Sequence, residues 1–125
     1  MTKLFSILII LSDHNQRVSF REMAERTFGI SVFSAGSAFQ GLDLLKRIKS
    51  PEFILLSSQP FPLMTYEQFL SHKSRDPSIA GIPVVLLSTA LIKPMPAGID
   101  QQVADLLSKE DLAALIKRYN SSTKN

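Results

Sequence analysis

Short apolar segments recur five times along the chain, and polar or turn-forming residues separate them. Each segment is four to eight residues long, which suits a β-strand better than a helix. Residues 4–11, 53–57 and 82–88 are apolar almost throughout, a pattern typical of strands that are covered on both faces of a parallel sheet. Residues 30–33 and 104–107 give shorter and weaker strand signals.

Amphipathic helices are predicted between and after these strands, at 16–27, 38–49, 66–76 and 110–119. In each of them apolar side chains recur at helical spacing, so that they share one face. The residues predicted to face the core are Phe20, Met23, Ala24, Thr27, Ala38, Leu42, Leu45, Ile48, Tyr66, Phe69, Leu70, Leu112, Leu115, Ile116 and Tyr119.

Capping and breaking residues mark where these helices begin and end. Asn15 is predicted to cap the first helix and Ser37 the second, because such side chains accept hydrogen bonds from N–H groups of the first turn. Gly29 is a suitable stop for the first helix. Pro51 breaks the chain before the third strand, and the third helix ends ahead of Pro77.

Strands and helices therefore alternate along the whole chain. This alternation predicts an α/β fold: a doubly wound, flavodoxin-like, five-stranded parallel sheet with helices on both faces. A chain of 125 residues is long enough for one domain with a substantial core, and no repeat or internal boundary divides it. We assign residues 1–120 to this domain and 121–125 to a polar tail or the start of a linker.

The segment between the fourth and fifth strands departs from the helical pattern where a fourth helix is expected. Pro94 and Pro96 each remove an amide donor and disfavour the helical conformation of the preceding residue. We therefore expect this helix to be shortened or distorted. Leu91, Ile92 and Met95 are apolar in a segment expected to be exposed, which favours an altered docking surface over a flexible loop.

Composition and charge exclude several classes of function. Hydrophobic residues make up 45% and charged residues 20%, as in ordinary globular proteins. The net charge is +3, but basic and acidic residues are interleaved, so we expect no nucleic-acid binding by this domain alone. The absence of cysteine excludes a disulfide scaffold and a thiolate zinc site. The apolar N-terminal run is too short for a membrane span and lacks a signal-peptide cleavage site, so we expect a cytoplasmic protein without membrane contact.

Polar residues stand at the carboxyl ends of the predicted strands, where function gathers in folds of this kind. Ser12 and Asp13 follow the first strand, and Ser57 ends the third. Ser88 ends the fourth strand, and Lys109 follows the fifth.

Four motifs around these positions resemble the landmarks of the response-regulator receiver domain (CheY-like) family. They are "ILIILSDHN", "SPEFILLSSQPFP", "IPVVLLSTA" and "ADLLSKEDL", in order and at suitable spacing. The resemblance covers essentially the whole chain. It implies the fold predicted above and a role in two-component signalling.

The resemblance also implies roles for single residues. In that family an acid pair helps to bind Mg²⁺, an aspartate accepts phosphate from a histidine kinase, and a hydroxyl and a lysine contact the phosphoryl group. Carried over, the acid pair falls on Ser12 and Asp13, the phosphoacceptor on Ser57, the hydroxyl on Ser88 and the lysine on Lys109. One acid and the acceptor are therefore absent.

Two further positions complete this comparison. The hydroxyl falls on Thr89 if the motif is aligned on Ala90, and the aromatic switch position falls on Leu106. Mg²⁺ usually takes more than one carboxylate, and a serine is a poor nucleophile without a base. We therefore expect a degenerate pocket with no metal and no cofactor. Asp13 and Lys109 either pair across this pocket or remain separately solvated.

The leading hypothesis is a pseudo-receiver, a non-enzymatic signalling module that acts by phosphorylation-independent protein–protein contact. Expected partners are a histidine kinase, an adaptor, a fused output domain or a second copy, with Leu91, Ile92, Met95 and Leu106 as contact residues. An alternative is the regulatory domain of a transcription regulator whose DNA-binding domain lies beyond residue 125. A flavodoxin-like cofactor-binding or enzymatic domain is disfavoured, because the loop after the first strand has no glycine.

Overall fold

The computed structural model describes residues 5–48, 50–59, 64–88, 93–95, 97–104 and 108–120. Strands and helices alternate along these residues, except that two strands follow each other near the end. The elements are β1 (Ser6–Ile10), α1 (His14–Phe28), β2 (Ser31–Ala35), α2 (Ala38–Leu45), β3 (Phe53–Ser57), α3 (Tyr66–Ser74), β4 (Val84–Ser88), β5 (Gln101–Ala104) and α4 (Lys109–Asn120).

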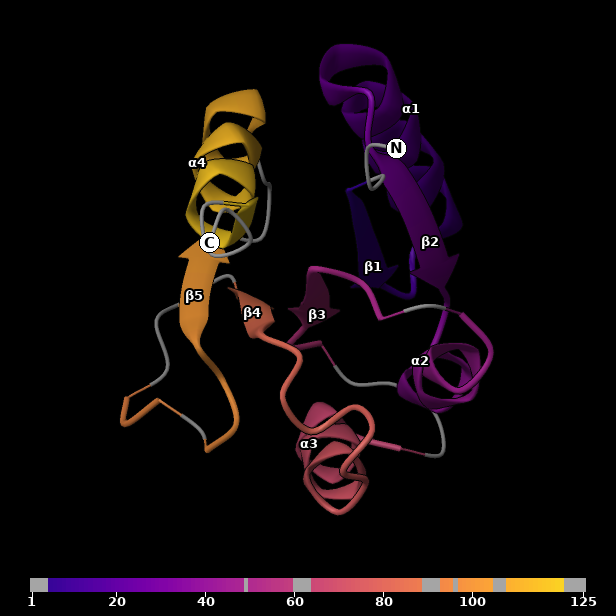
Figure 1. Ribbon diagram of the computed structural model, residues 1–125, viewed down its shortest axis with the longest axis vertical. Helices are drawn as coiled ribbons and strands as arrows, with labels where there is room; N and C mark the ends of the chain where they lie inside the picture. Colours follow the sequence, from indigo (N-terminus) through magenta and orange to yellow (C-terminus); the bar gives the residue numbers. More distant parts are fainter. Residues whose placement is uncertain are drawn as a thin grey trace.

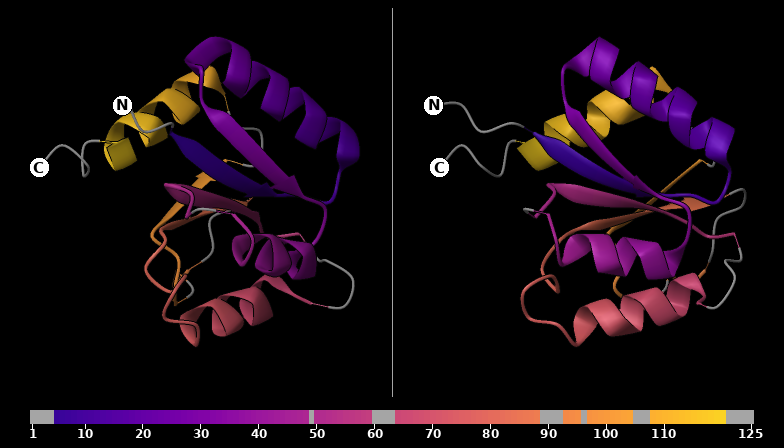
Figure 2. Two further views of the ribbon diagram at one scale, coloured as in Figure 1. Left: turned by 45° about the vertical axis from the view of Figure 1, so that its right-hand side comes forward. Right: turned by 90° about the vertical axis from the view of Figure 1, so that its right-hand side faces the viewer.

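All five strands lie parallel in one sheet, in the order β2-β1-β3-β4-β5 (Figure 1). Helices α1 and α4 cover one face of the sheet, and α2 and α3 cover the other (Figure 2). This arrangement confirms the predicted α/β, doubly wound, flavodoxin-like fold. Because β2 and β5 are the edge strands, the carboxyl ends of β1, β3 and β4 lie next to one another.

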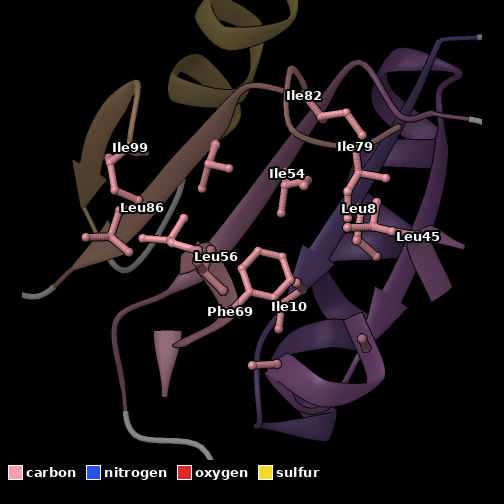
Figure 3. Close-up of a cluster of buried hydrophobic side chains, with 14 residues drawn as sticks. Leu8, Ile10, Leu45, Ile54, Leu56, Phe69, Ile79, Ile82, Leu86 and Ile99 are labelled. Carbon is pink, nitrogen blue, oxygen red and sulfur yellow. The ribbon is translucent and has the colours of Figure 1, made fainter. Parts of the chain in front are cut away.

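Two apolar clusters hold the helices against the sheet, one on each face. Successive side chains of β1 alternate between them: Ile7 and Ile9 pack on the side of α1 and α4, and Leu8 and Ile10 on the side of α2 and α3. Figure 3 shows the ring of Phe69, from α3, beside Ile10. Every residue of β3 and β4 is buried, which explains why these strands are apolar without alternation.

The first helix begins two residues before the predicted start. Asp13, and not Asn15, is the N-cap of α1, and its Oδ1 accepts a hydrogen bond from the Gln16 amide at 3.0 Å. Gly29 ends the helix in the left-handed conformation with φ of 65°, as predicted. Thr27 was predicted to face the core but is exposed, because the helix turns it away from the sheet.

The second helix begins as predicted and ends early. Ser37 caps α2, and its Oγ accepts a hydrogen bond from the Gln40 amide at 3.2 Å. The helix ends at Leu45, ahead of the predicted end at residue 49, and a turn follows. Leu42 and Leu45 pack against the cluster between α2, α3 and the sheet, as the helical spacing predicted.

The last strand begins three residues before its predicted start. β5 pairs with β4 from Gln101 opposite Val85 to Ala104 opposite Ser88, whereas the apolar pattern predicted a strand over 104–107. Residues 105–107 lie outside the described part of the chain. Between β4 and β5, residues 93–95 and 97–100 form no helix, and residues 89–92 and 96, where the shortened or distorted helix was also predicted, lie outside the described part of the chain.

Candidate functional site

The carboxyl ends of three neighbouring strands bring the predicted pocket residues to one edge of the sheet. Leu56 lies opposite Ile10, and Ser57 lies opposite Leu87. Ser57 and Ser88 therefore end adjacent strands, and residues 12 and 13 leave β1 beside them. This is the edge at which open α/β sheets bind ligands.

Ser57 is fully buried at the end of β3. Its Oγ accepts a hydrogen bond from the Gln59 amide at 3.1 Å. The Ser58 amide donates to the Leu87 carbonyl at 2.9 Å, which keeps the chain beside β4 just after the strand ends. The hydroxyl of Ser57 thus stabilises the exit from β3.

Asp13, the acid that remains from the predicted pair, is the N-cap of α1. Asp13 is exposed, and its carboxylate caps α1, where the helix dipole favours a negative charge. Ser12, at the other position of the pair, is also exposed.

Arg17 adds a positive charge to this edge. Its Nη1 donates to the Leu11 carbonyl at 2.6 Å and to the Ser12 carbonyl at 2.9 Å, and its side chain is half-buried. The sequence analysis did not single out Arg17. A signal was available, because a residue four positions after the Asp13 cap lies on the helix face that returns toward the strand end.

The other predicted residues do not join this cluster in the described part of the chain. Lys109 is the exposed first residue of α4, five positions after the last residue of β5. Among the described ion pairs none joins Lys109 to Asp13. Met95 is 45% exposed. Thr89, Leu91, Ile92 and Leu106 lie outside the described residues.

The described residues include neither a metal-binding cluster nor a membrane-spanning helix. Within these ranges, no group of three or more His, Cys, Asp or Glu side chains is arranged to hold a metal ion. No described helix is both long enough and apolar enough to cross a bilayer.

A buried lysine lies at the opposite end of the sheet. Lys73 of α3 is 5% exposed, and its Nζ donates to the Ala80 carbonyl at 2.8 Å. Burial lowers the pKa of Lys73, and the nearby Asp100 carboxylate partly opposes this shift. Asp100 accepts a hydrogen bond from the Val84 amide at 2.8 Å, and both side chains line a cavity of about 370 Å³.

No protein-family model and no curated protein matches the sequence of this chain. Solved structures do match it in three dimensions. The receiver domain of a signal transduction histidine kinase from Syntrophus aciditrophicus is 23% identical, with a TM-score of 0.80 over 97% of this chain and 93% of that one. A two-component response regulator from Legionella pneumophila is 23% identical, with a TM-score of 0.81 over 95% and 99% of the two chains.

A third match has a metal in its pocket. The receiver domain of a sensor histidine kinase from Pseudomonas aeruginosa, solved with a magnesium ion in the active-site cleft, is 14% identical. Its TM-score is 0.82 over 95% of this chain and 99% of that one. The chain thus has the receiver (CheY-like) fold, which confirms at the level of the fold the resemblance carried by its motifs.

Proposed function

We propose that this chain is a pseudo-receiver, a two-component signalling module that acts by protein–protein contact without aspartyl phosphorylation. The observation that carries the proposal is Ser57. It ends β3, where the receiver resemblance puts the phosphoacceptor, and its hydroxyl is buried and bonded to the Gln59 amide. A serine hydroxyl is a weak nucleophile unless a base removes its proton.

The charges around this edge also support the proposal. Asp13 is engaged as a helix cap, and the Arg17 guanidinium lies against the carbonyls of Leu11 and Ser12. The resemblance puts the other magnesium-binding acid at Ser12. A fixed cation at this position repels Mg²⁺, whereas a carboxylate would bind it.

A non-enzymatic role for residues 1–120 follows from this pocket chemistry. The partner is a histidine kinase, an adaptor, a fused output domain or a second copy of the chain, met in the cytoplasm. Such a module signals through a constant surface, because it has no phosphoryl group to change its shape.

Treatment with a small acyl phosphate and Mg²⁺, followed by intact-mass measurement, tests the proposal. We expect no phosphoryl addition to the wild-type chain. We also expect none to Ser57→Asp alone, because Ser12 still leaves Mg²⁺ short of one acid of the pair after β1, and Arg17 adds a positive charge there. The magnesium-binding receiver domain from Pseudomonas aeruginosa is the positive control.

Each result of this assay has a separate meaning. A phosphoryl group mapped to Ser57 of the wild-type chain would overturn the pseudo-receiver proposal. Rapid phosphorylation of Ser57→Asp would leave the proposal standing for the natural chain but would disprove the role given to Ser12 and Arg17.

A further inference from the structure

We propose that a second site, a basic cavity between α1 and the end of β2, binds a phosphate group. The cavity has a volume of about 260 Å³. Three basic side chains of α1 form one wall, and polar groups of β2 and the start of α2 form the other. The residues that carry the argument are His14, Arg17, Arg21, Ser34, Gly36 and Gln40.

The wall formed by α1 is positively charged. Arg17 and Arg21 are four residues apart, so both guanidinium groups lie on one face of the helix. Arg17 is held in place by the carbonyls at the end of β1, which bind only its Nη1. Its Nη2 lies 3.5 Å from the His14 Nδ1, so the guanidinium is fixed on two sides and offers the cavity its charge and the N–H groups that these contacts leave over.

The acid nearest to these arginines pairs with Arg21 but does not line the cavity. Glu25 binds the Arg21 Nε at 3.3 Å, and the same Oε2 accepts a hydrogen bond from the Val32 amide at 3.3 Å. Its carboxylate is thereby directed to the backbone of β2. Among the described residues that line the cavity there is no carboxylate.

The opposite wall offers further donors and leaves space for a ligand. The Gly36 amide donates to the Gln40 Oε1 at 2.9 Å, which orients the side-chain amide so that its NH₂ group remains a donor. A Cβ at Gly36 would lie 3.0 Å from the Arg17 Nη1, so the missing side chain lets the Arg17 guanidinium lie against this wall. The Ser34 hydroxyl also lines the cavity.

These groups select the class of ligand. Two guanidinium groups, an amide NH₂ and a hydroxyl match the oxygens of a phosphate dianion. The volume lies below the range of about 300–1,000 Å³ that holds drug-sized ligands, so the ligand is small. It is orthophosphate or a small phosphate monoester. The site lies beside the edge strand β2, with β1 between it and β3, and it shares Arg17 with the carboxyl edge of β1.

Backbone-amide NMR of the isotope-labelled chain, titrated at constant ionic strength, tests the assignment. Orthophosphate, phosphoserine and chloride are the three probes. We expect saturable shifts around the cavity with both phosphates and none with chloride. Tighter binding of phosphoserine assigns the site to monoesters, and equal or weaker binding assigns it to the free anion.

Two substitutions connect binding to the cavity. Arg21→Gln should weaken phosphate binding about tenfold, because it removes a charge-assisted contact. Gln40→Glu keeps the acceptor for the Gly36 amide but adds a negative charge inside the cavity. It should abolish phosphate binding and raise the melting temperature in phosphate-free buffer, since its carboxylate replaces the anion.

Matched controls lie on the same helix. Arg26→Gln removes an exposed basic residue of α1 that does not line the cavity, and should leave phosphate binding unchanged. Glu25→Gln keeps an acceptor for the Val32 amide, removes the ion pair of Arg21 and should not weaken binding. Phosphate affinity that is unchanged in both Arg21→Gln and Gln40→Glu would overturn the proposal, as would equal amide shifts with chloride.

Discussion

Lys73 carries a charge in a place where water cannot solvate it well. Its side chain is buried beneath the turn that follows α3, with one hydrogen bond to the Ala80 carbonyl. Burial disfavours the protonated amine, so the pKa of Lys73 is lower in the folded chain than in the unfolded chain. In the pH window between these two values the unfolded chain binds more protons, and the free energy of unfolding rises with pH.

Replacement of Lys73 should remove this dependence. We expect the unfolding free energy of Lys73→Met to change less than that of the wild type over the pH range just below the ordinary pKa of a lysine. Urea denaturation at several pH values measures the difference. Lys117→Met, which removes an exposed lysine of α4, is the control and should keep the wild-type slope. Equal slopes in the wild type and Lys73→Met would show that the buried amine does not titrate in this window.

The sequence identifies which residue types stand at the carboxyl edge but not how they are bonded. Ser57 and Ser88 could be placed there because chain order alone puts the ends of parallel strands together. Helical spacing could have placed Arg17 near the end of β1, but not the carbonyls that it binds. The contact of Lys73 could not be predicted, because it depends on a long side chain reaching a backbone carbonyl in the folded chain. The capping role of Asp13 was missed because Asn15, two residues later, satisfies the same local rule.

At the scale of the elements, two glycines can be compared: Gly29 at the end of α1 and Gly81 in the turn before β4. Gly29 adopts φ of 65° at the end of α1, and a Cβ there would meet no other atom within 4 Å. Gly81 also has open space but no positive φ. The two positions therefore differ in backbone conformation and not in packing.

Alanine at these positions should separate conformational strain from packing. Gly29→Ala should destabilise the fold by about 1 kcal/mol, because an L-residue is strained in the left-handed region. Gly81→Ala should cause no loss, since it only reduces the freedom of the unfolded chain. Thermal or urea unfolding measures both changes. A loss at Gly81 as large as that at Gly29 would contradict the explanation from φ.

The elements that were predicted well are those that the sheet buries on both faces. The whole of β3 and most of the segment predicted for β4 lie where continuous apolar runs placed them. β5 was shifted because it is an edge strand that carries Gln101 and Gln102, and its position is set by pairing with β4. Residues 104–107, which contain two leucines, gave a stronger local strand signal than the residues that form β5.

For the whole molecule, the segment between β4 and β5 remains the predicted docking surface. Met95 is among the few large apolar side chains that are exposed in the described residues. Replacement of Leu91, Ile92 and Met95 by Ser should weaken binding to a partner by about tenfold or more, because apolar anchors dominate such interfaces. The measurements are sedimentation analysis of self-association and titration with a candidate partner such as a histidine kinase.

A control variant shows whether weaker binding comes from this segment in particular or from the loss of any exposed apolar side chain. Phe39 of α2 is 59% exposed and lies elsewhere in the fold, so Phe39→Ser should leave partner binding unchanged. If the triple variant folds and binds as the wild type does, the interface lies elsewhere. If it fails to fold, the segment belongs to the core.

The alternation of β1 side chains between the two apolar clusters has a consequence for how the molecule comes apart. The same central strands supply side chains to both clusters. If the helices of one face came away, they would expose apolar side chains of strands that still form the core of the other face. Neither pair of helices packs on strands that the other pair does not also use. Both faces of the sheet therefore open together as one cooperative unit. Backbone amides of β1 and β3 then exchange their hydrogens with solvent only when the entire chain opens, and a ligand bound at any edge of the sheet slows all of them alike.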